Sequence, residues 1–320
     1  MNSSQKIKVS VSCKAFNHGK YIRQTLEGFV SQKTNFQFEV IVHDDASTDN
    51  TCEIIREYAE KYPDIIKPIY QKENQYSKRV PAFKVFMLPK MQGKYIAFCE
   101  GDDYWCDCYK LQKQVDFLDS HPEYSACAHN SIWLDYYKNE VRLYNKSLEA
   151  FDLETVHVVK DGGAYYHTSA VMYRMEFARE VQSDKRPEFF GIVKNVGDYP
   201  LSIYLTLKGK VRYLPDVMSV YRYGVPGSWT KRMENRDHFM QTQYSIVEML
   251  KSVDKYTEFK IHDTIQPLID ERCQMLLNIE TKIGVLYSED MKKVFNEQTI
   301  IQKLKILMKL LFINRIRYCR

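Results

Sequence analysis

The 320-residue sequence has no apolar run that approaches the roughly 18 residues needed to cross a bilayer. Its first six residues are polar and lack the apolar segment of a secretory signal. It also has no low-complexity block, and its 44% hydrophobic and 13% aromatic residues are typical of a packed core, not of a disordered or fibrous chain. These absences predict a folded cytoplasmic protein with one large domain and an appendage, or with two domains.

The eight cysteines lack the spacing of a zinc site. Cys106 and Cys108 are the only close pair, and a gap of one residue is not a normal zinc spacing. No second Cys or His pair completes a set of four ligands. We interpret the cysteines as buried or half-buried thiols in a reducing compartment.

Acidic residues are missing from one end of the chain. Residues 299–320 contain six basic side chains and no acidic one, and subtracting them from the formal charge of +5 leaves −1 for the rest. This nearly neutral body argues against a nucleic-acid-binding surface. Apolar residues and lysines share residues 299–320 at helical spacing. The pattern predicts peripheral contact with the inner face of the plasma membrane or, alternatively, packing on protein.

Strand and helix patterns alternate through the first 130 residues. With short connections, this order predicts βαβ units and a mainly parallel α/β sheet flanked by helices. Strands are expected at 9–13, 38–42, 65–70, 95–99, 156–159, 170–173, 211–214 and 217–221. Helices are expected after the first, second and fourth of these strands. Further helices are expected at 81–91, 199–207, 239–253 and 261–286. We therefore expect a catalytic domain at 1–230 and a helical region with a basic tail at 231–320.

Acidic residues directly follow two of these strands. Asp44 and Asp45 follow the second strand, and Glu100, Asp102 and Asp103 follow the fourth. Ligands of open parallel sheets bind at the carboxyl ends of the strands. Crowded carboxylates repel one another without a cation, and such oxygen ligands suit Mg²⁺ or Mn²⁺ with substrate phosphates in the remaining positions. The acids thus indicate a site for a metal diphosphate, although solvated turns and helix caps are an alternative.

Three segments together resemble the family 2 inverting glycosyltransferases of GT-A (Rossmann-like) fold. They are Val9-Ser10-Val11 with Phe16-Asn17, residues 40–49, and residues 99–105. The resemblance spans roughly residues 7 to 230 and is closest to bacterial enzymes of capsule, O-antigen or other surface polysaccharides. It implies transfer of a hexose from a UDP-sugar to a saccharide acceptor, often lipid-linked, with Mn²⁺ or Mg²⁺.

The resemblance also implies a role for each acid. Asp45 would accept a hydrogen bond from the uracil ring, and Asp44 would orient its loop or contact the nucleoside. Asp102 would ligate the metal. Glu100, which stands where the family has an aspartate, would hold the ribose or a metal-bound water. Asp103 would support the metal site or face the acceptor.

Basic residues near these strand ends are candidate ligands of the diphosphate. Lys14, His18 and either Lys78 or Arg79 would contact its oxygens, as cations should. The alternative is that these side chains are simply solvated.

Residues 195–201 resemble the acceptor-side motif of the family. Asp198 would be the general base that takes the proton of the acceptor hydroxyl during in-line attack. Its position also suits a helix N-cap, and one residue can do both. His167-Thr168-Ser169 matches an acceptor-facing segment or, alternatively, an ordinary strand edge.

Residues 221–229 resemble a flexible closing loop, with one departure. Gly224 stands where many relatives have a histidine that contacts the diphosphate or metal. Water, Arg222 or Lys231 would then balance the charge, or metal dependence would be weaker. Trp105 and Trp229 are expected either to stack on a sugar or to pack in the core.

Two other functions fit part of the pattern. A nucleotidyltransferase would share the acidic metal chemistry, but it would need a Gly-rich basic loop where this chain has Lys14-Ala15-Phe16-Asn17-His18. A nucleotide-sugar-binding scaffold without turnover is compatible with Glu100 and Gly224. Asp198 distinguishes the scaffold from a transferase, because only the transferase needs this base.

Overall fold

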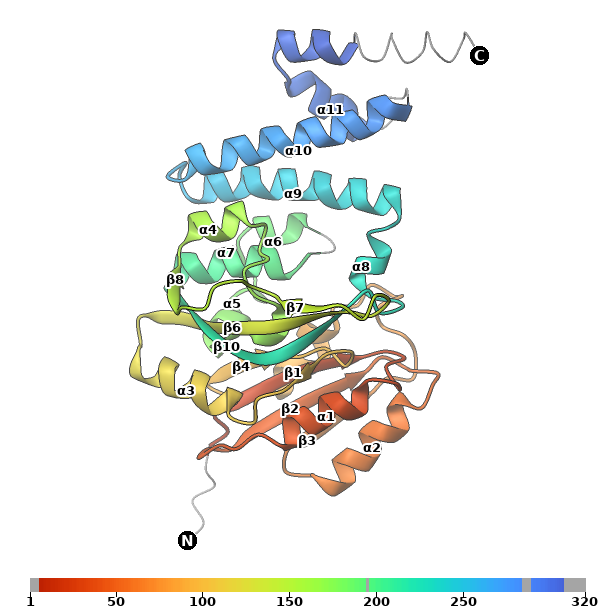
Figure 1. Cartoon of the computed structure of the whole chain (residues 1–320), viewed down its shortest axis with the longest axis vertical. Coiled ribbons are helices and arrows are strands. Elements are labelled where there is room, and N and C mark those ends of the chain that lie inside the picture. The colour runs from red at the N-terminus through yellow and green to blue at the C-terminus, as the bar shows by residue number, and fades with distance from the viewer. Residues whose placement is uncertain (1–5, 194–195, 284–288, 308–320) are drawn as a thin grey trace. The chain divides into compact units, whose positions relative to one another are not determined.

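The computed structural model describes residues 6–193, 196–283 and 289–307 (Figure 1). The chain divides into two compact units. The first unit is Met1–Arg186 with Leu201–Lys231, and the second is Pro187–Pro200 with Arg232–Arg320. Residues 187–200 thus group with the second unit, and the domain boundary near residue 230 stays a prediction.

The described part of the first unit contains one sheet of ten strands in the order β3-β2-β1-β4-β9-β6-β10-β5, with β7 paired to β6 and β8 paired to β10. The strands are β1 (Val9–Ala15), β2 (Phe38–Asp44), β3 (Ile66–Tyr70), β4 (Tyr95–Phe98), β5 (Tyr104–Trp105), β6 (Tyr124–Asp135), β7 (Val141–Leu143), β8 (Phe151–Leu153), β9 (Met172–Arg174) and β10 (Lys210–Tyr223).

Six of these strands run in the same direction. β1 pairs in parallel with β2 and β4, β2 with β3, and β6 with β10. β9 is antiparallel to both β4 and β6, so β4 and β6 point the same way. The mainly parallel sheet expected from the sequence is therefore confirmed, with β9 as a reversed strand inside it. The carboxyl ends of β1, β2, β4, β6 and β10 lie at one edge of the sheet.

The helices of the first unit flank this sheet (Figure 1). They are α1 (Ile22–Val30), α2 (Thr51–Lys61), a π-helical turn η1 (Phe83–Met87), the 3₁₀ turns η2 (Leu88–Lys90) and η3 (Thr168–Ala170), α3 (Lys110–Ser120), α4 (Thr155–Lys160), α5 (Met175–Glu180) and α8 (Trp229–Arg232). α7 (Asp198–Lys208) begins in the second unit and ends in the first. The second unit contains α6 (Phe189–Ile192), α9 (Arg236–Tyr256), α10 (His262–Ile283) and α11 (Glu289–Glu297).

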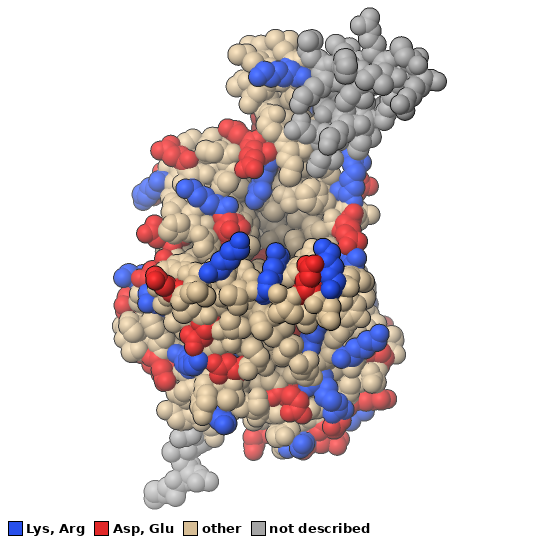
Figure 2. Space-filling view, in the orientation of Figure 1, with Lys and Arg blue, Asp and Glu red and all other residues tan. Residues whose placement is uncertain are grey.

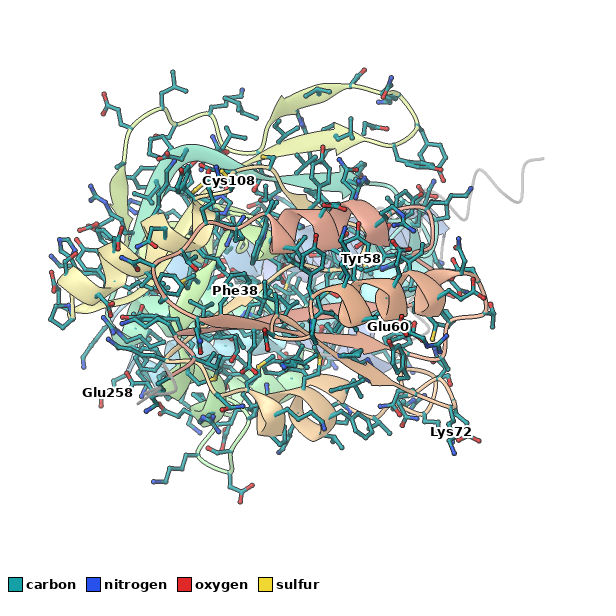
Figure 3. All side chains as sticks on the ribbon, turned by 90° about the horizontal axis from the view of Figure 1, so that it is seen from below. Phe38, Tyr58, Glu60, Lys72, Cys108 and Glu258 are labelled. Carbon is teal, nitrogen blue, oxygen red and sulfur yellow. The ribbon has the colours of Figure 1, made fainter. Side chains whose placement is uncertain are left out.

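The N-terminal half of the sheet is held by an apolar core between β1, β2 and the helices α1 and α2. Ile22, Leu26 and Phe29 of α1 are fully buried, and their spacing places them on one face of the helix. Phe38 of β2 joins the same core and lies among its side chains in Figure 3. This packing fixes where β1 and β2 end, and thus where the loops that follow them begin.

Trp105 belongs to the core, so the expectation that it stacks on a sugar is wrong. Its side chain is buried, its ring packs 4.8 Å from that of Phe29, and its Nε1 donates to the Ser169 carbonyl at 3.1 Å. Gly28 allows this approach, because a Cβ there would lie 2.8 Å from the Trp105 carbonyl oxygen.

Three sequence expectations about secondary structure differ from the observed elements. Residues 156–159 form part of α4, which begins after Glu154 in an extended conformation and buries Val158 and Val159 while His157 and Lys160 stay exposed. The strands expected at 211–214 and 217–221 are one strand, β10, with register shifts between them. The helix expected at 81–91 is divided into η1 and η2.

Lys110, the first residue of α3, is a buried lysine in this core. Its Nζ donates to Gln114 Oε1 at 2.8 Å and lies 4.1 Å from the centre of the Trp105 ring. Burial lowers the pKa of Lys110 to about 7, because a charged ammonium is poorly solvated there.

We expect Lys110 to make stability depend on pH. Between pH 7 and the ordinary lysine pKa near 10.4 the unfolded chain binds the extra proton, so the free energy of unfolding rises with pH by up to about 1.4 kcal/mol per unit. Lys110→Met should remove this contribution to the slope. The loss of the hydrogen bond to Gln114 changes the free energy of unfolding by the same amount at each pH and does not affect the slope. Urea unfolding at three pH values in this range measures it. Lys84→Met, at an exposed lysine, is the control; equal slopes in wild type and Lys110→Met would contradict the assignment.

Candidate functional site

Both acidic loops are attached to the carboxyl end of β1. The backbone N–H of Asp45 donates to the Ala15 carbonyl at 3.0 Å, and that of Gly101 donates to the Lys14 carbonyl at 2.9 Å. β1 lies between β2 and β4 in the sheet, so the acids come from strands on either side of it. The structure thus brings the Asp44-Asp45 loop and the residue 100–103 loop to adjacent places at one edge of the sheet.

Asp44 organises the loop after β2. Its side chain is buried, and its Oδ1 accepts a 2.5 Å hydrogen bond from the Ser47 hydroxyl. That hydroxyl in turn accepts from the backbone N–H of Asn17 at 2.9 Å, which joins this loop to the one after β1. Burial raises the pKa of the Asp44 carboxyl above its ordinary value. These contacts join the loop of Asp44 to the loop after β1, and the role of Asp44 at the nucleotide stays a prediction.

Asp45 holds the loop of residues 71–80. Its two carboxylate oxygens accept from the backbone N–H groups of Gln75 at 2.7 Å and Tyr76 at 3.0 Å. The Asn74 amide also donates to the Asp45 carbonyl at 3.1 Å. Each carboxylate oxygen has a second acceptor position, so these bonds leave room for a further donor. The contact of Asp45 with a uracil ring stays a prediction.

Lys78 and Arg79, the expected diphosphate ligands, lie on this same loop and are exposed. The Lys78 ammonium pairs with Glu73, a neighbour within the loop. Lys72, at the start of the loop, projects at the outside of the molecule in Figure 3. The contacts of Lys78 and Arg79 with phosphate stay predictions. To bind phosphate, the Lys78 ammonium would have to leave Glu73.

Asp45→Asn should loosen residues 71–80. An amide NH₂ group would face one of the two backbone donors, and losing a charge-assisted hydrogen bond costs about 1.5–3 kcal/mol. Exchange of the Gln75 and Tyr76 amide hydrogens should therefore become at least roughly tenfold faster. Hydrogen exchange measures this, with the exposed Asp64→Asn as the control. Unchanged exchange at both amides would show that Asp45 does not hold the loop.

Asp102 and Glu100 face two basic side chains from the loop after β1. Glu100 Oε1 lies 3.1 Å from Lys14 Nζ, and Asp102 Oδ2 lies 4.0 Å from His18 Nε2. The charge of Glu100 is the main cause of the raised pKa of Lys14, which keeps this ammonium positive. His18 packs directly over Gly101, because a Cβ at this glycine would lie 2.7 Å from His18 Nδ1.

The donor set at Asp102 and Glu100 fits a hard divalent cation that also binds phosphate. Both are carboxylates, the ligands that Mg²⁺ and Mn²⁺ prefer. In the described ranges no three His, Cys, Asp or Glu side chains gather closely enough to hold a metal ion by themselves. A cation bound by these two acids would therefore take its other ligands from substrate and water, as Mg²⁺ commonly does.

Asp103 is turned into the protein. It is buried, its Oδ1 accepts from the backbone N–H of Arg222 at 2.8 Å, and its Oδ2 lies 3.7 Å from His167 Nε2. Burial, followed by the negative charge of Asp102, raises the pKa of the Asp103 carboxyl well above its usual range. Asp103 thus joins the acidic loop to β10, and His167 lies beside the same carboxylate.

Two residues that the sequence analysis did not assign here also hold the acidic loop. Thr25 Oγ1 donates to the carbonyls of Gly101 at 3.0 Å and Asp103 at 2.5 Å. The Arg222 guanidinium, considered earlier only as a cation for the diphosphate, donates to the Asp102 carbonyl and to Gln24. A hydroxyl on the apolar face of α1 was a usable signal for Thr25, because a buried hydroxyl needs a partner.

The loop after β10 contains the position where a histidine was expected. Gly224 has φ of +80°, a backbone conformation that glycine adopts readily and a histidine rarely does. Trp229, at the start of α8, is 41% exposed, so stacking on a ligand remains open to it. Phe16, which the sequence pattern alone did not single out for a role, is 44% exposed directly after Ala15, whose carbonyl accepts from the backbone N–H of Asp45.

Asp198 is the first residue of α7 and is counted with the second unit, whereas the other candidate acids are in the first. Its Oδ1 accepts from the backbone N–H of Tyr199 at 2.9 Å. The side chain keeps contact with solvent, yet the protein around it raises the pKa of its carboxyl. Asn195 of the same motif lies outside the described residues. The role of Asp198 as a base stays a prediction.

Charges of both signs are interspersed over the face drawn in Figure 2. Some of the charged side chains of the first unit are paired, such as Lys94 and Lys8 with Asp119, at 2.7 and 2.5 Å. Within the described residues, this face has no broad basic area of the kind that follows a nucleic-acid backbone.

Comparison with known proteins connects these features to one family. The family model described as "Glycosyl transferase family 2" matches residues 10–182. A Mycobacterium tuberculosis protein is 35% identical over 244 residues, which are 73% of this chain and 64% of that protein. The chain thus spans less than two thirds of this relative. The Escherichia coli UDP-Glc:alpha-D-GlcNAc-diphosphoundecaprenol beta-1,3-glucosyltransferase WfaP is 31% identical over 128 residues, 40% of this chain and 48% of that enzyme.

Solved structures share the fold. Staphylococcus aureus TarS 1-349 aligns over 95% of this chain and 81% of that one, with a TM-score of 0.60 and 17% identity. The mannosyltransferase PcManGT of Pyrobaculum calidifontis, solved with GDP-Man and Mn²⁺, covers 97% of this chain and 87% of its own, with a TM-score of 0.53 and 15% identity. These similarities confirm the GT-A fold that the sequence predicted.

Proposed function

Because the chain belongs to glycosyl transferase family 2, we propose that it transfers a hexose from a UDP-sugar to a saccharide acceptor with inversion at the anomeric carbon. The acceptor is proposed to be lipid-linked and the product to be a capsule, O-antigen or other surface polysaccharide. The named E. coli relative uses UDP-Glc and a diphosphoundecaprenol-linked acceptor, and TarS has been solved with UDP-GlcNAc, which supports both parts of the proposal.

One observation carries this proposal: the two acidic loops are bonded to adjacent residues at the end of β1. The loop of Asp45 would contact the nucleobase, with the exposed ring of Phe16 available to stack on it. The loop of Glu100 and Asp102 would bind the diphosphate end through a divalent cation, which stabilises the negative charge on the leaving UDP. Lys14 and His18 lie beside these carboxylates and would contact phosphate oxygens.

Transfer with inversion needs one proton acceptor. The acceptor hydroxyl oxygen forms a bond to the anomeric carbon while the bond from that carbon to the diphosphate oxygen breaks. The proton of the hydroxyl passes to a carboxylate, which we assign to Asp198. A raised pKa makes the ionised Asp198 a stronger base than an ordinary aspartate.

Release of nucleoside diphosphate tests this function. The full chain is incubated with a panel of UDP- and GDP-hexoses and Mn²⁺, with and without a chelator, and product nucleotide is quantified. We expect release from at least one UDP-sugar, and loss of that release in Asp102→Asn. Binding of UDP-sugar without any release, with the acceptor supplied, would favour the binding scaffold. No release and no thermal shift with any nucleotide would refute the proposal.

Asp198→Asn should bind UDP-sugar with unchanged affinity and lose transfer by roughly a hundredfold or more, because the acceptor hydroxyl would have no base. Calorimetric titration measures binding, and product formation measures transfer. The exposed Asp184→Asn serves as a matched control that should retain both. Normal transfer by Asp198→Asn would remove this residue from the mechanism.

We further propose that the basic C-terminal segment contacts an anionic membrane. Residues 300–307 are helical, and Ile300, Ile301, Leu304 and Leu307 are 77%, 67%, 57% and 44% exposed. Lys303 and Lys305 lie within the same helix, while residues 308–320 of the expected segment lie outside the described residues. Exposed apolar side chains beside lysines suit an anionic bilayer surface. No helix among the described residues is long and apolar enough to span a membrane.

The chain should sediment with phosphatidylglycerol vesicles and not with phosphatidylcholine vesicles. Lys303→Glu with Lys305→Glu should weaken this binding at least tenfold, since each lysine near an anionic surface contributes about 1 kcal/mol. Leu304→Ser should weaken it as well. Val141→Ser, at an exposed apolar residue of β7, is the control. No sedimentation with phosphatidylglycerol vesicles would refute membrane contact, and equal sedimentation with both lipids would refute the preference for an anionic surface.

A further inference from the structure

Three tyrosines are exposed together at the sheet edge that carries the acids. Tyr136 and Tyr137 lie in the turn after β6 and are 39% and 60% exposed, and Tyr223 ends β10 and is 37% exposed. β6 and β10 run in the same direction as β1, β2 and β4, so all five strands end at this edge. We propose that Tyr136, Tyr137 and Tyr223 form an aromatic platform on which a sugar ring of the acceptor stacks. This inference rests on the proposed function.

The platform is built on a fixed turn. Asp135 Oδ1 accepts from the backbone N–H groups of Tyr137 and Lys138, both at 2.9 Å. The backbone N–H of Tyr136 donates to the Tyr223 carbonyl at 2.9 Å, which joins the turn to the end of β10. The rings are therefore held in place before a ligand arrives, and little conformational entropy is lost on binding.

The three rings pack against neighbouring rings, and much of each side chain remains exposed to solvent. The Tyr136 and Tyr137 rings are nearly perpendicular with centroids 5.3 Å apart, and the Tyr223 ring packs 4.7 Å from that of Trp133. Gly224 passes beside Tyr137, since a Cβ there would lie 3.5 Å from the Tyr137 ring. The φ of +80° at Gly224, which favours glycine, lets the chain turn away from β10 here.

Arg222 connects the platform to the acidic loop. Its backbone N–H binds Asp103 at 2.8 Å, and its guanidinium bonds to the Asp102 carbonyl and lies 5.2 Å from the Tyr21 ring. The Tyr21 ring lies edge-on to Tyr136, with centroids 6.2 Å apart. A continuous series of contacts thus runs from the acidic loop proposed to hold the donor, through Arg222 and Tyr21, to the exposed tyrosines.

The chemistry of the platform suits a saccharide better than an acyl chain. A sugar ring has an apolar C–H face with hydroxyls around its rim, and tyrosine offers an apolar ring with a hydroxyl at its tip. Tyrosine also provides a large contact area at a low cost in conformational entropy. Proximity to the acidic loop then identifies the ligand as the sugar that accepts the hexose, not the nucleotide.

Saccharide binding by the full chain tests the platform. The probes are methyl glycosides and disaccharides of glucose, galactose and N-acetylglucosamine, titrated with UDP and Mn²⁺ present and followed by saturation-transfer NMR. Tyr137→Ala and Tyr136→Ala should weaken binding of the bound probe roughly tenfold and leave the affinity for UDP unchanged. Tyr137→Phe keeps the ring and should retain binding within about threefold, which excludes misfolding as the cause.

Tyr109→Ala is the matched control, because Tyr109 is 48% exposed but lies in the loop before α3. It should bind saccharide and UDP as the wild type does. Unchanged saccharide binding in both alanine variants, or a wild type that binds UDP but none of the probes, would overturn the platform while the proposed function stands. Loss of vesicle binding or of a dimer in these variants, with saccharide binding intact, would assign the surface to another partner. A wild type that binds no nucleotide would refute the proposed function itself.

Discussion

The carboxyl end of β1 is the constraint on which the candidate site depends. Two backbone carbonyls there, of Lys14 and Ala15, each accept one N–H from a different acidic loop. The core beneath them, where α1 packs on the strands, fixes the position of this strand end. Acids that are more than fifty residues apart in the sequence thereby become neighbours through main-chain bonds, to which Thr25 and Arg222 add side-chain bonds.

Carboxylates that lie close together repel one another, and the acids of these loops are stabilised in different ways. Asp44 and Asp103 are buried and satisfied by protein hydrogen bonds, and the pKa of each carboxyl is raised. Glu100 is balanced by Lys14. Asp102 pairs with His18 at 4.0 Å, a longer contact than the 3.1 Å pair of Glu100 and Lys14, so its charge is less fully balanced and it is the acid best placed to meet an external cation. A set of acids that looked equivalent in sequence thus divides into structural members and members available to a ligand.

Much of this organisation was readable from the sequence, and the failures have physical causes. Short apolar strands followed at once by acids predicted the ends of β2 and β4, because strand burial and loop chemistry are both local signals. β6 was missed because it buries polar residues such as Asn130 and Ser131, whose side chains bond to Asn145 and Ser219 from another segment and another strand. The inward turn of Asp103 was equally hidden, since it depends on Arg222, more than a hundred residues away. The position of Asp198 depends on tertiary structure in the same way.

The reversed strand β9 lies between two groups of parallel strands, and the ends of these two groups can change independently in evolution. On one side lie the ends of β1, β2 and β4, tied together through main-chain bonds that tolerate few changes of length. On the other lie the ends of β6 and β10, where the turn from β6 to β7 is closed by Asp135 and makes none of those bonds. Substitutions and insertions in the turn after β6 can therefore accumulate during evolution while the loops bonded to β1 are retained.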